Sequence, residues 1–128
     1  MGNGTSIGKV RGLGSAHEGS HHWWHQRLTA GANLMLMLWL IFSLALLPAH
    51  DQATFTAWLG ETVAAVPMIL LIAITVYHFR LGLQVVIEDY VHNESGVVLI
   101  VLINLFSIAV ATLAIFSILK IAFTSGAA

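Results

Sequence analysis

Three apolar runs constrain this chain more than any other feature of its sequence. They cover about residues 28–47, 63–87 and 97–123. Each run has the roughly 20 residues that an α-helix needs to cross the hydrocarbon core of a bilayer. A helix also satisfies its backbone hydrogen bonds within the segment, which lipid cannot do. The sequence therefore predicts an all-α integral membrane protein, with a polar N-terminal segment at 1–27 and one three-helix anchor domain at 28–123.

The charge and cysteine content narrow the possible functions. Only 9% of the residues are charged, whereas a soluble domain carries about 25%. The formal net charge of −1 offers no basic surface for nucleic acid. With no cysteine in the chain, disulfides, thiolate-bound iron–sulfur clusters and covalently attached c-type haem are all excluded. An iron–sulfur cluster that feeds electrons to this protein must belong to another polypeptide.

The distribution of basic residues predicts the orientation in the membrane. Lys9, Arg11 and Arg27 precede the first apolar run, while the connection at 48–62 contains no lysine or arginine. By the positive-inside rule, the N-terminus is expected inside and the connection at 48–62 outside. The connection at 88–96 then returns to the inside.

The outer connection contains signals for a short helix. Asp51 is a good N-cap residue. Phe55, Trp58 and Leu59 follow it at the i, i+3, i+4 spacing that puts side chains on one face of a helix. This pattern predicts a short helix that lies in the membrane interface.

His78 is the only histidine within the predicted spans. Ionisable groups in spans are usually functional, although membrane histidines also serve as interhelical hydrogen-bonding groups. Asp89 lies eleven residues later on the same helical face, roughly 16 Å along the axis, and Gly82 removes bulk one turn after His78. The acid and the adjacent phenol of Tyr90 suggest redox chemistry, with haem at His78 and a quinone at the far end. A low-spin b-type haem needs a second imidazole, so either a partner supplies it or no haem is present.

Three further features leave alternatives open. The acids before Tyr90 oppose the helix dipole, and they can also be simple solvated residues after a span. The histidine-rich cluster at 21–27 could suggest zinc, but adjacent histidines cannot all face one ion, which favours an aromatic belt and a partner contact. Arg80 is expensive in a span unless it is paired, and we assign it no role from sequence.

The third run carries a stripe of small, slightly polar residues. Asn104, Ser107, Ala111 and Ala114 lie on one side of the expected helix. Such a stripe is typical of a helix-packing face. We interpret it as a face that needs a partner from outside the chain.

The pattern of His78, ten intervening residues and Asp89-Tyr90 resembles the D-type hydrophobic anchor subunits of succinate dehydrogenase, respiratory complex II. The resemblance covers roughly residues 19 to 120. It includes Gly82, Gln84, Val85, the run Asp89-Tyr90-Val91-His92, and the segment His21…Trp24…Arg27 with Thr29-Ala30. The histidine-arginine-histidine signature of the C-type partner is absent.

The resemblance implies specific roles for four residues. His78 is expected to be one axial ligand of haem b, with the other histidine coming from the C-type cytochrome b anchor subunit. Tyr90 is expected to hydrogen-bond a carbonyl oxygen of ubiquinone, with Asp89 supporting Tyr90 or a proton route. Arg27 is expected to neutralise a haem propionate.

The resemblance also implies the partners. Succinate oxidation would occur on a flavoprotein subunit, and an iron–sulfur subunit would pass the electrons on, so this chain is not catalytic alone. We expect a multi-pass protein of a bacterial inner membrane rather than a mitochondrial one, because no Arg- and Ser-rich leader precedes the spans.

Two other functions remain compatible with the residues. One is a haem-free structural anchor for a different peripheral oxidoreductase. The other is a small transporter that uses His78 and Asp89 as a proton relay. Three spans without an internal repeat argue against the transporter.

Overall fold

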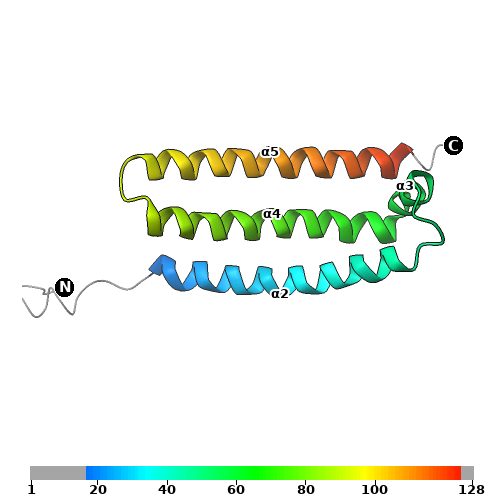
Figure 1. Ribbon diagram of the computed structural model, residues 1–128, viewed down its shortest axis with the longest axis horizontal. Helices are drawn as coiled ribbons and strands as arrows, with labels where there is room; N and C mark the ends of the chain where they lie inside the picture. The colour runs from blue at the N-terminus through cyan, green and yellow to red at the C-terminus, as the bar shows by residue number, and fades with distance from the viewer. Residues whose placement is uncertain (1–16, 125–128) are drawn as a thin grey trace, which may run out of the picture.

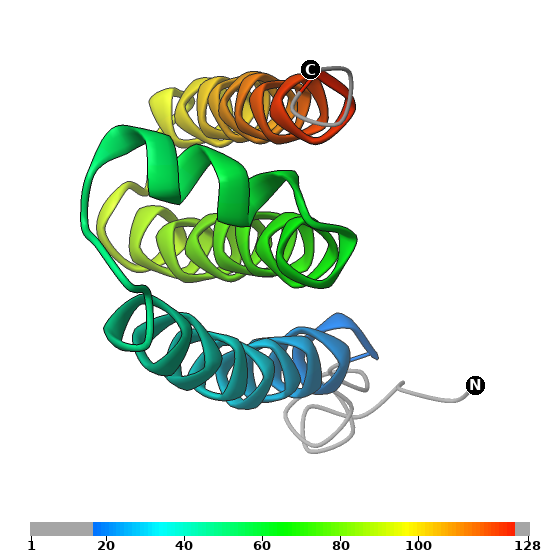
Figure 2. The same cartoon turned by 90° about the vertical axis from the view of Figure 1, so that its right-hand side faces the viewer.

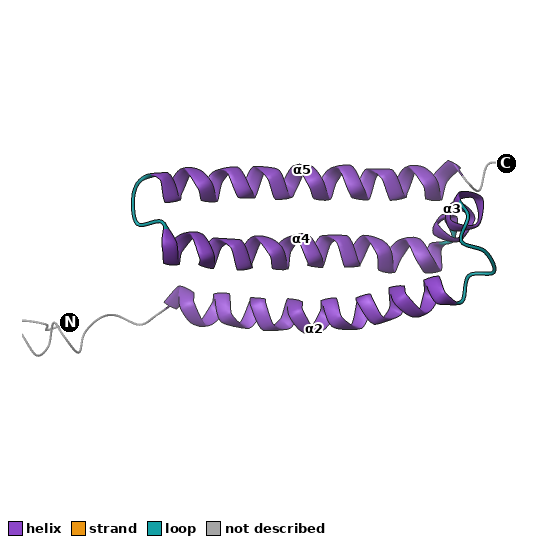
Figure 3. Cartoon of the chain, viewed as in Figure 1, coloured by secondary structure: helices purple, strands orange, loops and turns teal. Residues whose placement is uncertain are grey.

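The computed structural model describes residues 17–124, and within them the chain is all-α, as the sequence predicts (Figures 1 and 3). Four helices follow one another: α2 (His17–Ala45), α3 (Gln52–Gly60), α4 (Thr62–Tyr90) and α5 (Ser95–Thr124). Three segments within them are long and apolar enough to cross a membrane, namely Gly19–Ala45, Thr62–Tyr90 and Ser95–Thr124. The predicted number of spans is therefore confirmed.

The helices differ from the apolar runs mainly at their ends. Helix α2 begins at His17, well inside the stretch that we expected to be a separate polar segment. Helix α4 continues through the acids to Tyr90, where the N–H of Val91 donates to the carbonyl of Ile87 at 2.8 Å. Polar residues can remain helical beyond the hydrocarbon because the helix satisfies their backbone groups wherever it runs. Lys9 and Arg11, on which the predicted orientation partly rests, lie outside the described residues.

The three long helices form a row with α4 in the middle. An end-on view shows α5 on one side of α4 and α2 on the other (Figure 2). Helices α2 and α5 do not pack against each other within residues 17–124. The start of α2, the end of α4 and the start of α5 share one end of the row, and α3 lies at the opposite end (Figure 1).

The stripe on α5 packs within the chain, which corrects our interpretation from sequence. Ser107 is only 4% exposed, and Asn104 accepts a hydrogen bond from Nε of Arg80 on α4. The small side chains let the two helices approach, and the amide gives the arginine a partner. At least this part of the stripe is therefore covered by α4, while the hydroxyl of Ser107 has no hydrogen-bond partner within residues 17–124.

Helix α3 forms as predicted, and part of its apolar side packs within the chain. Asp51 caps it by accepting a hydrogen bond from the backbone N–H of Thr54 at 3.3 Å, and hydrogen bonds from the Thr54 side chain and then its N–H lower the pKa of Asp51. Leu59 is buried in a cluster with Ala65 and Ile118. The short helix therefore packs onto the ends of α4 and α5, and its position in the membrane interface stays a prediction.

Candidate functional site

His78 lies on α4 where that helix packs against α2. Its Nδ1 is 2.9 Å from Oγ1 of Thr29, a residue 49 positions earlier in the chain. Thr29 is 8% exposed, one of the few buried polar residues in the structure. The other ring nitrogen, Nε2, makes no hydrogen bond within residues 17–124. The imidazole is thus held at one nitrogen and open at the other.

The Thr29–His78 contact is one of three contacts that follow one another along α2 and α4, and we call this series the ladder. Towards the end of the row that carries α3, Oγ1 of Thr75 donates to Oδ1 of Asn33 at 3.0 Å. Towards the end of the row where α2 starts, a Cβ at Gly82 would lie 3.5 Å from Nε2 of Gln26. A side chain at Gly82 would therefore make an ordinary van der Waals contact with Gln26 of the neighbouring helix, and the space that we expected it to leave beside the imidazole stays a prediction.

Sequence reasoning missed the α2 half of this ladder, although a signal was present. His22, Gln26, Thr29 and Asn33 recur at intervals of four, three and four residues. That spacing puts all of them on one face of a helix. A polar face within an apolar run indicates a buried helix contact rather than lipid.

A groove of about 900 Å³ lies between α2 and α4, next to the ladder and towards the start of α2. Its lining includes the polar residues His22, Gln26, Arg80 and Gln84. Nε2 of His22 and Oε1 of Gln26 are buried without a hydrogen-bond partner in the described chain. Buried polar atoms of this kind normally meet water or a bound group, so the groove suits a polar occupant.

The histidine-rich cluster divides between two environments. The rings of His21 and His25 stack with centroids 5.3 Å apart, and His25 meets the edge of Tyr77 on α4 at 6.2 Å. The guanidinium of Arg27 lies 4.5 Å from the ring centroid of Trp23. Within residues 17–124, no three His, Cys, Asp or Glu side chains gather as a zinc site requires.

The structure does not bring Arg27 next to His78. Arg27 lies two residues before Thr29 on α2, which is roughly 200° around the helix. Its side chain therefore leaves α2 from a different side than the one that faces α4. No carboxylate pairs with Arg27 in the described part of the chain, so its charge is available to a group outside it.

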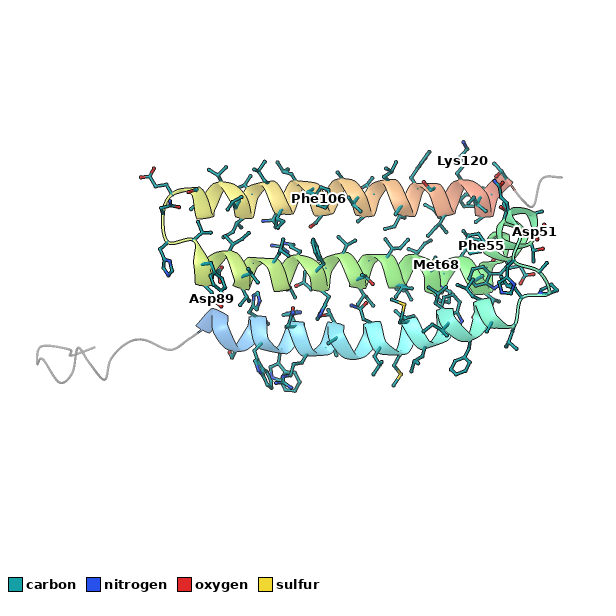
Figure 4. All side chains as sticks on the ribbon, in the orientation of Figure 1. Asp51, Phe55, Met68, Asp89, Phe106 and Lys120 are labelled. Atoms are coloured by element: carbon teal, nitrogen blue, oxygen red, sulfur yellow. The ribbon has the colours of Figure 1, made fainter. Side chains whose placement is uncertain are left out.

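Asp89 and Tyr90 end α4 at the same end of the row as the start of α2 (Figure 4). Both side chains are exposed, Tyr90 by 80%. Neighbouring Glu88 accepts a hydrogen bond from Nε2 of Gln84 at 2.8 Å. Asp89 and Tyr90 have no such partner within residues 17–124. Their exposed side chains form an open polar edge at the end of α4, which this chain alone does not cover.

Comparison with known proteins gives consistent matches. Residues 1–115 match the model of the succinate dehydrogenase/fumarate reductase transmembrane subunit family. A succinate dehydrogenase hydrophobic membrane anchor subunit from Rickettsia bellii is 37% identical over 106 residues, which is 81% of this chain and 84% of the relative.

More distant relatives have similar descriptions. A succinate dehydrogenase membrane anchor subunit from Reclinomonas americana is 33% identical over 96 residues, 72% of this chain and 80% of the relative. A hydrophobic membrane anchor subunit from Paracoccus denitrificans is 27% identical over 111 residues, 87% of this chain and 86% of the relative. No solved structure matches the chain significantly.

Proposed function

The chain belongs to the succinate dehydrogenase/fumarate reductase transmembrane subunit family, and we propose that it anchors a succinate dehydrogenase in the membrane and holds part of a haem b and ubiquinone site. The observation that carries this proposal is the environment of His78. One ring nitrogen contacts Thr29 and the other has no hydrogen bond in the described chain. A histidine that served only to hydrogen-bond two helices together would not need a ring nitrogen without a hydrogen bond.

The residues of this chain fit one half of a b-type haem site. A metal-binding imidazole uses one nitrogen for the iron and holds the other by a hydrogen bond, which is the arrangement available to His78. A second imidazole has to come from a C-type cytochrome b anchor subunit. Bound there, haem b would supply a one-electron carrier within the membrane.

Arg27 is the candidate for pairing with a haem propionate. Its guanidinium has no carboxylate partner within residues 17–124, and it is held over the ring of Trp23. Stacking on an aromatic ring fixes the planar group without using its N–H donors. Those donors remain free for a carboxylate outside the chain.

Tyr90 and Asp89 form the chain's share of the quinone site. The phenol is a donor on a short, stiff side chain, and its 80% exposure leaves it free to reach a quinone carbonyl. Asp89, also exposed, keeps the surroundings polar and offers a proton route from the inner aqueous phase. Iron–sulfur and C-type subunits would complete the site, and a flavoprotein subunit would oxidise succinate.

The orientation with the N-terminus inside suits this arrangement. It puts the start of α2 and the end of α4 on the inner side of a bacterial inner membrane, while Asp51, Phe55 and Lys120 lie at the outer end (Figure 4). Electrons from peripheral subunits on the inner side would then reach the exposed end of α4 at Tyr90 before the rest of this chain. Protons for quinone reduction come from the same side.

The test is His78→Ala in the intact complex, with His50→Ala as the control. His50 is exposed in the connection at the outer end and touches none of the groups above. Haem content is measured by the pyridine haemochrome assay. We expect His78→Ala to remove or loosen haem b and His50→Ala to leave it unchanged. An unchanged haem content and spectrum in His78→Ala would refute the ligand assignment.

A further inference from the structure

Thr29 makes three polar contacts through a single oxygen. Its Oγ1 is 2.7 Å from the carbonyl oxygen of His25 and 3.1 Å from that of Gln26, one turn earlier on α2. The same atom is 2.9 Å from Nδ1 of His78 on α4. At 8% exposure, Thr29 has little access to any other group.

A hydroxyl has one proton and two lone pairs. The carbonyl oxygens of His25 and Gln26 can only accept, so the proton of Thr29 has to lie between Oγ1 and these two oxygens. Were the proton turned towards His78 instead, Oγ1 would face a carbonyl oxygen at 2.7 Å with no hydrogen between them. That arrangement opposes two electron-rich atoms and is unfavourable.

The proton in the contact with His78 therefore comes from the imidazole. Nδ1 carries hydrogen and donates to Oγ1 of Thr29. A neutral imidazole has only one N–H, so its second nitrogen, Nε2, holds the lone pair. Nε2 of His78 is the nitrogen that makes no hydrogen bond within residues 17–124.

We propose that Thr29 is a positioning residue for His78: by accepting from Nδ1 it fixes the tautomer whose Nε2 can bind iron, and it sets the orientation of the ring. This inference rests on the proposed haem site. Hydrogen bonding at the second nitrogen makes an imidazole a stronger donor to its metal. Thr29 would then tune both the affinity for haem and the haem's reduction potential.

Thr75 offers a matched control on the same helix interface. Its hydroxyl also bridges α2 and α4, through Oδ1 of Asn33 at 3.0 Å, but it touches no ring nitrogen. Valine at either position keeps the volume of threonine and removes the hydroxyl. The comparison of Thr29→Val with Thr75→Val separates an effect on His78 from a general loosening of the two helices.

The experiment uses the intact complex and measures haem transfer to an excess of a haem-binding apoprotein, together with the midpoint potential of the haem. We expect Thr29→Val to lower haem affinity roughly 10- to 100-fold and to shift the potential upwards, since a weaker donor favours the reduced iron. Thr29→Ser should restore both values, and Thr75→Val should match the wild type in both.

Each other outcome decides against one specific statement. If Thr29→Val leaves affinity and potential unchanged while His78→Ala loses haem, the positioning role is wrong and the ligand role stands. Equal shifts in Thr29→Val and Thr75→Val would reduce Thr29 to a packing residue. If His78→Ala keeps its haem, the proposed function itself fails. Should Thr29→Val not assemble, Thr29→Ala and Thr29→Ser replace it, and identical behaviour of these two would overturn the proposal.

Discussion

Arg80 is the charged side chain that most needs a partner inside the membrane. Its Nε donates to Oδ1 of Asn104 on α5, so an amide on the neighbouring span compensates a charge that lipid would not tolerate. The sequence marked Arg80 as expensive and marked Asn104 as part of a packing stripe. Only the structure shows that the two side chains are partners.

We predict that Asn104→Leu destabilises the complex by about 1.5–3 kcal/mol, because hydrogen bonds to charged groups contribute this much. A double-mutant cycle with Arg80→Leu checks the reason. The double variant should lose less stability than the two single variants added together, since removing both partners leaves no unpaired charge. Stability is measured by thermal dissociation in detergent. Strict additivity would mean that the two side chains do not interact in the membrane.

Tyr90→Phe keeps the aromatic ring and removes the phenol donor. The loss of a neutral hydrogen bond should cost about 0.5–1.5 kcal/mol of quinone binding, and more if the bond strengthens as charge develops on the quinone. Succinate–quinone reductase activity should therefore fall at least several-fold. Succinate oxidation by an artificial acceptor upstream of the quinone should stay near the wild-type rate.

The other tyrosine of the chain provides the control for this variant. Tyr77 lies within α4 and contacts His25 edge-on, away from the open edge at Tyr90. Tyr77→Phe should leave both activities unchanged. If Tyr90→Phe lowered both activities together, Tyr90 would have a structural role and no direct part in quinone reduction.

At the scale of elements, the tightest constraint lies at the turn between α4 and α5. A Cβ at Gly96 would lie 2.9 Å from the carbonyl oxygen of Val91, while the N–H of Gly96 donates to the carbonyl of Asn93 at 2.9 Å. Any side chain here must push apart the end of one span and the start of the next. The sequence alone showed a glycine near a turn, without showing which atom it avoids.

Gly96→Ala should therefore destabilise the protein by about 1–3 kcal/mol, the usual cost of overpacking. Gly31→Ala is the matched control, because a Cβ there meets nothing of this chain within 4 Å. Alanine in a helix interior is better than glycine by up to about 1 kcal/mol, so this control should be neutral or slightly stabilising. Thermal dissociation of the complex compares the two, and equal melting temperatures would contradict the steric argument.

At the scale of the whole molecule, the row of three helices buries few of its own side chains. Helix α4 has a neighbour on two sides, whereas α2 and α5 do not meet within residues 17–124 (Figure 2). Lipid can cover apolar side chains, but it cannot satisfy the buried unpaired atoms of His22 and Gln26. The open nitrogen of His78 and the exposed edge at Tyr90 also lack partners in the described chain.

We therefore expect that the chain is not stable alone. Expressed without the other subunits, it should be degraded in the cell or aggregate in mild detergent. Co-expression with the flavoprotein, iron–sulfur and C-type subunits should restore its accumulation. Size-exclusion chromatography and circular dichroism check this, and a monodisperse monomer of full helicity would count against the heteromeric assembly.

The amino-acid sequence by itself determined the all-α class, the three spans, the short capped helix after Asp51 and the residues His78, Asp89 and Tyr90 as candidates. These features depend on local quantities, namely apolar length, helical spacing and capping chemistry. Helix ends were less predictable, because His17 to Arg27 and Glu88 to Tyr90 are polar yet helical. The roles of the candidate residues stay predictions.

Only the tertiary structure decided which faces meet. Thr29 and His78 are 49 positions apart, and their contact depends on how far α2 is displaced along α4. That register results from side-chain packing along the entire interface, where Gly82 lies beside Gln26 and Thr75 is hydrogen-bonded to Asn33. The tertiary structure likewise decided that the α5 stripe packs on α4 and that Leu59 is buried. A pattern along one helix does not specify which neighbour will cover it.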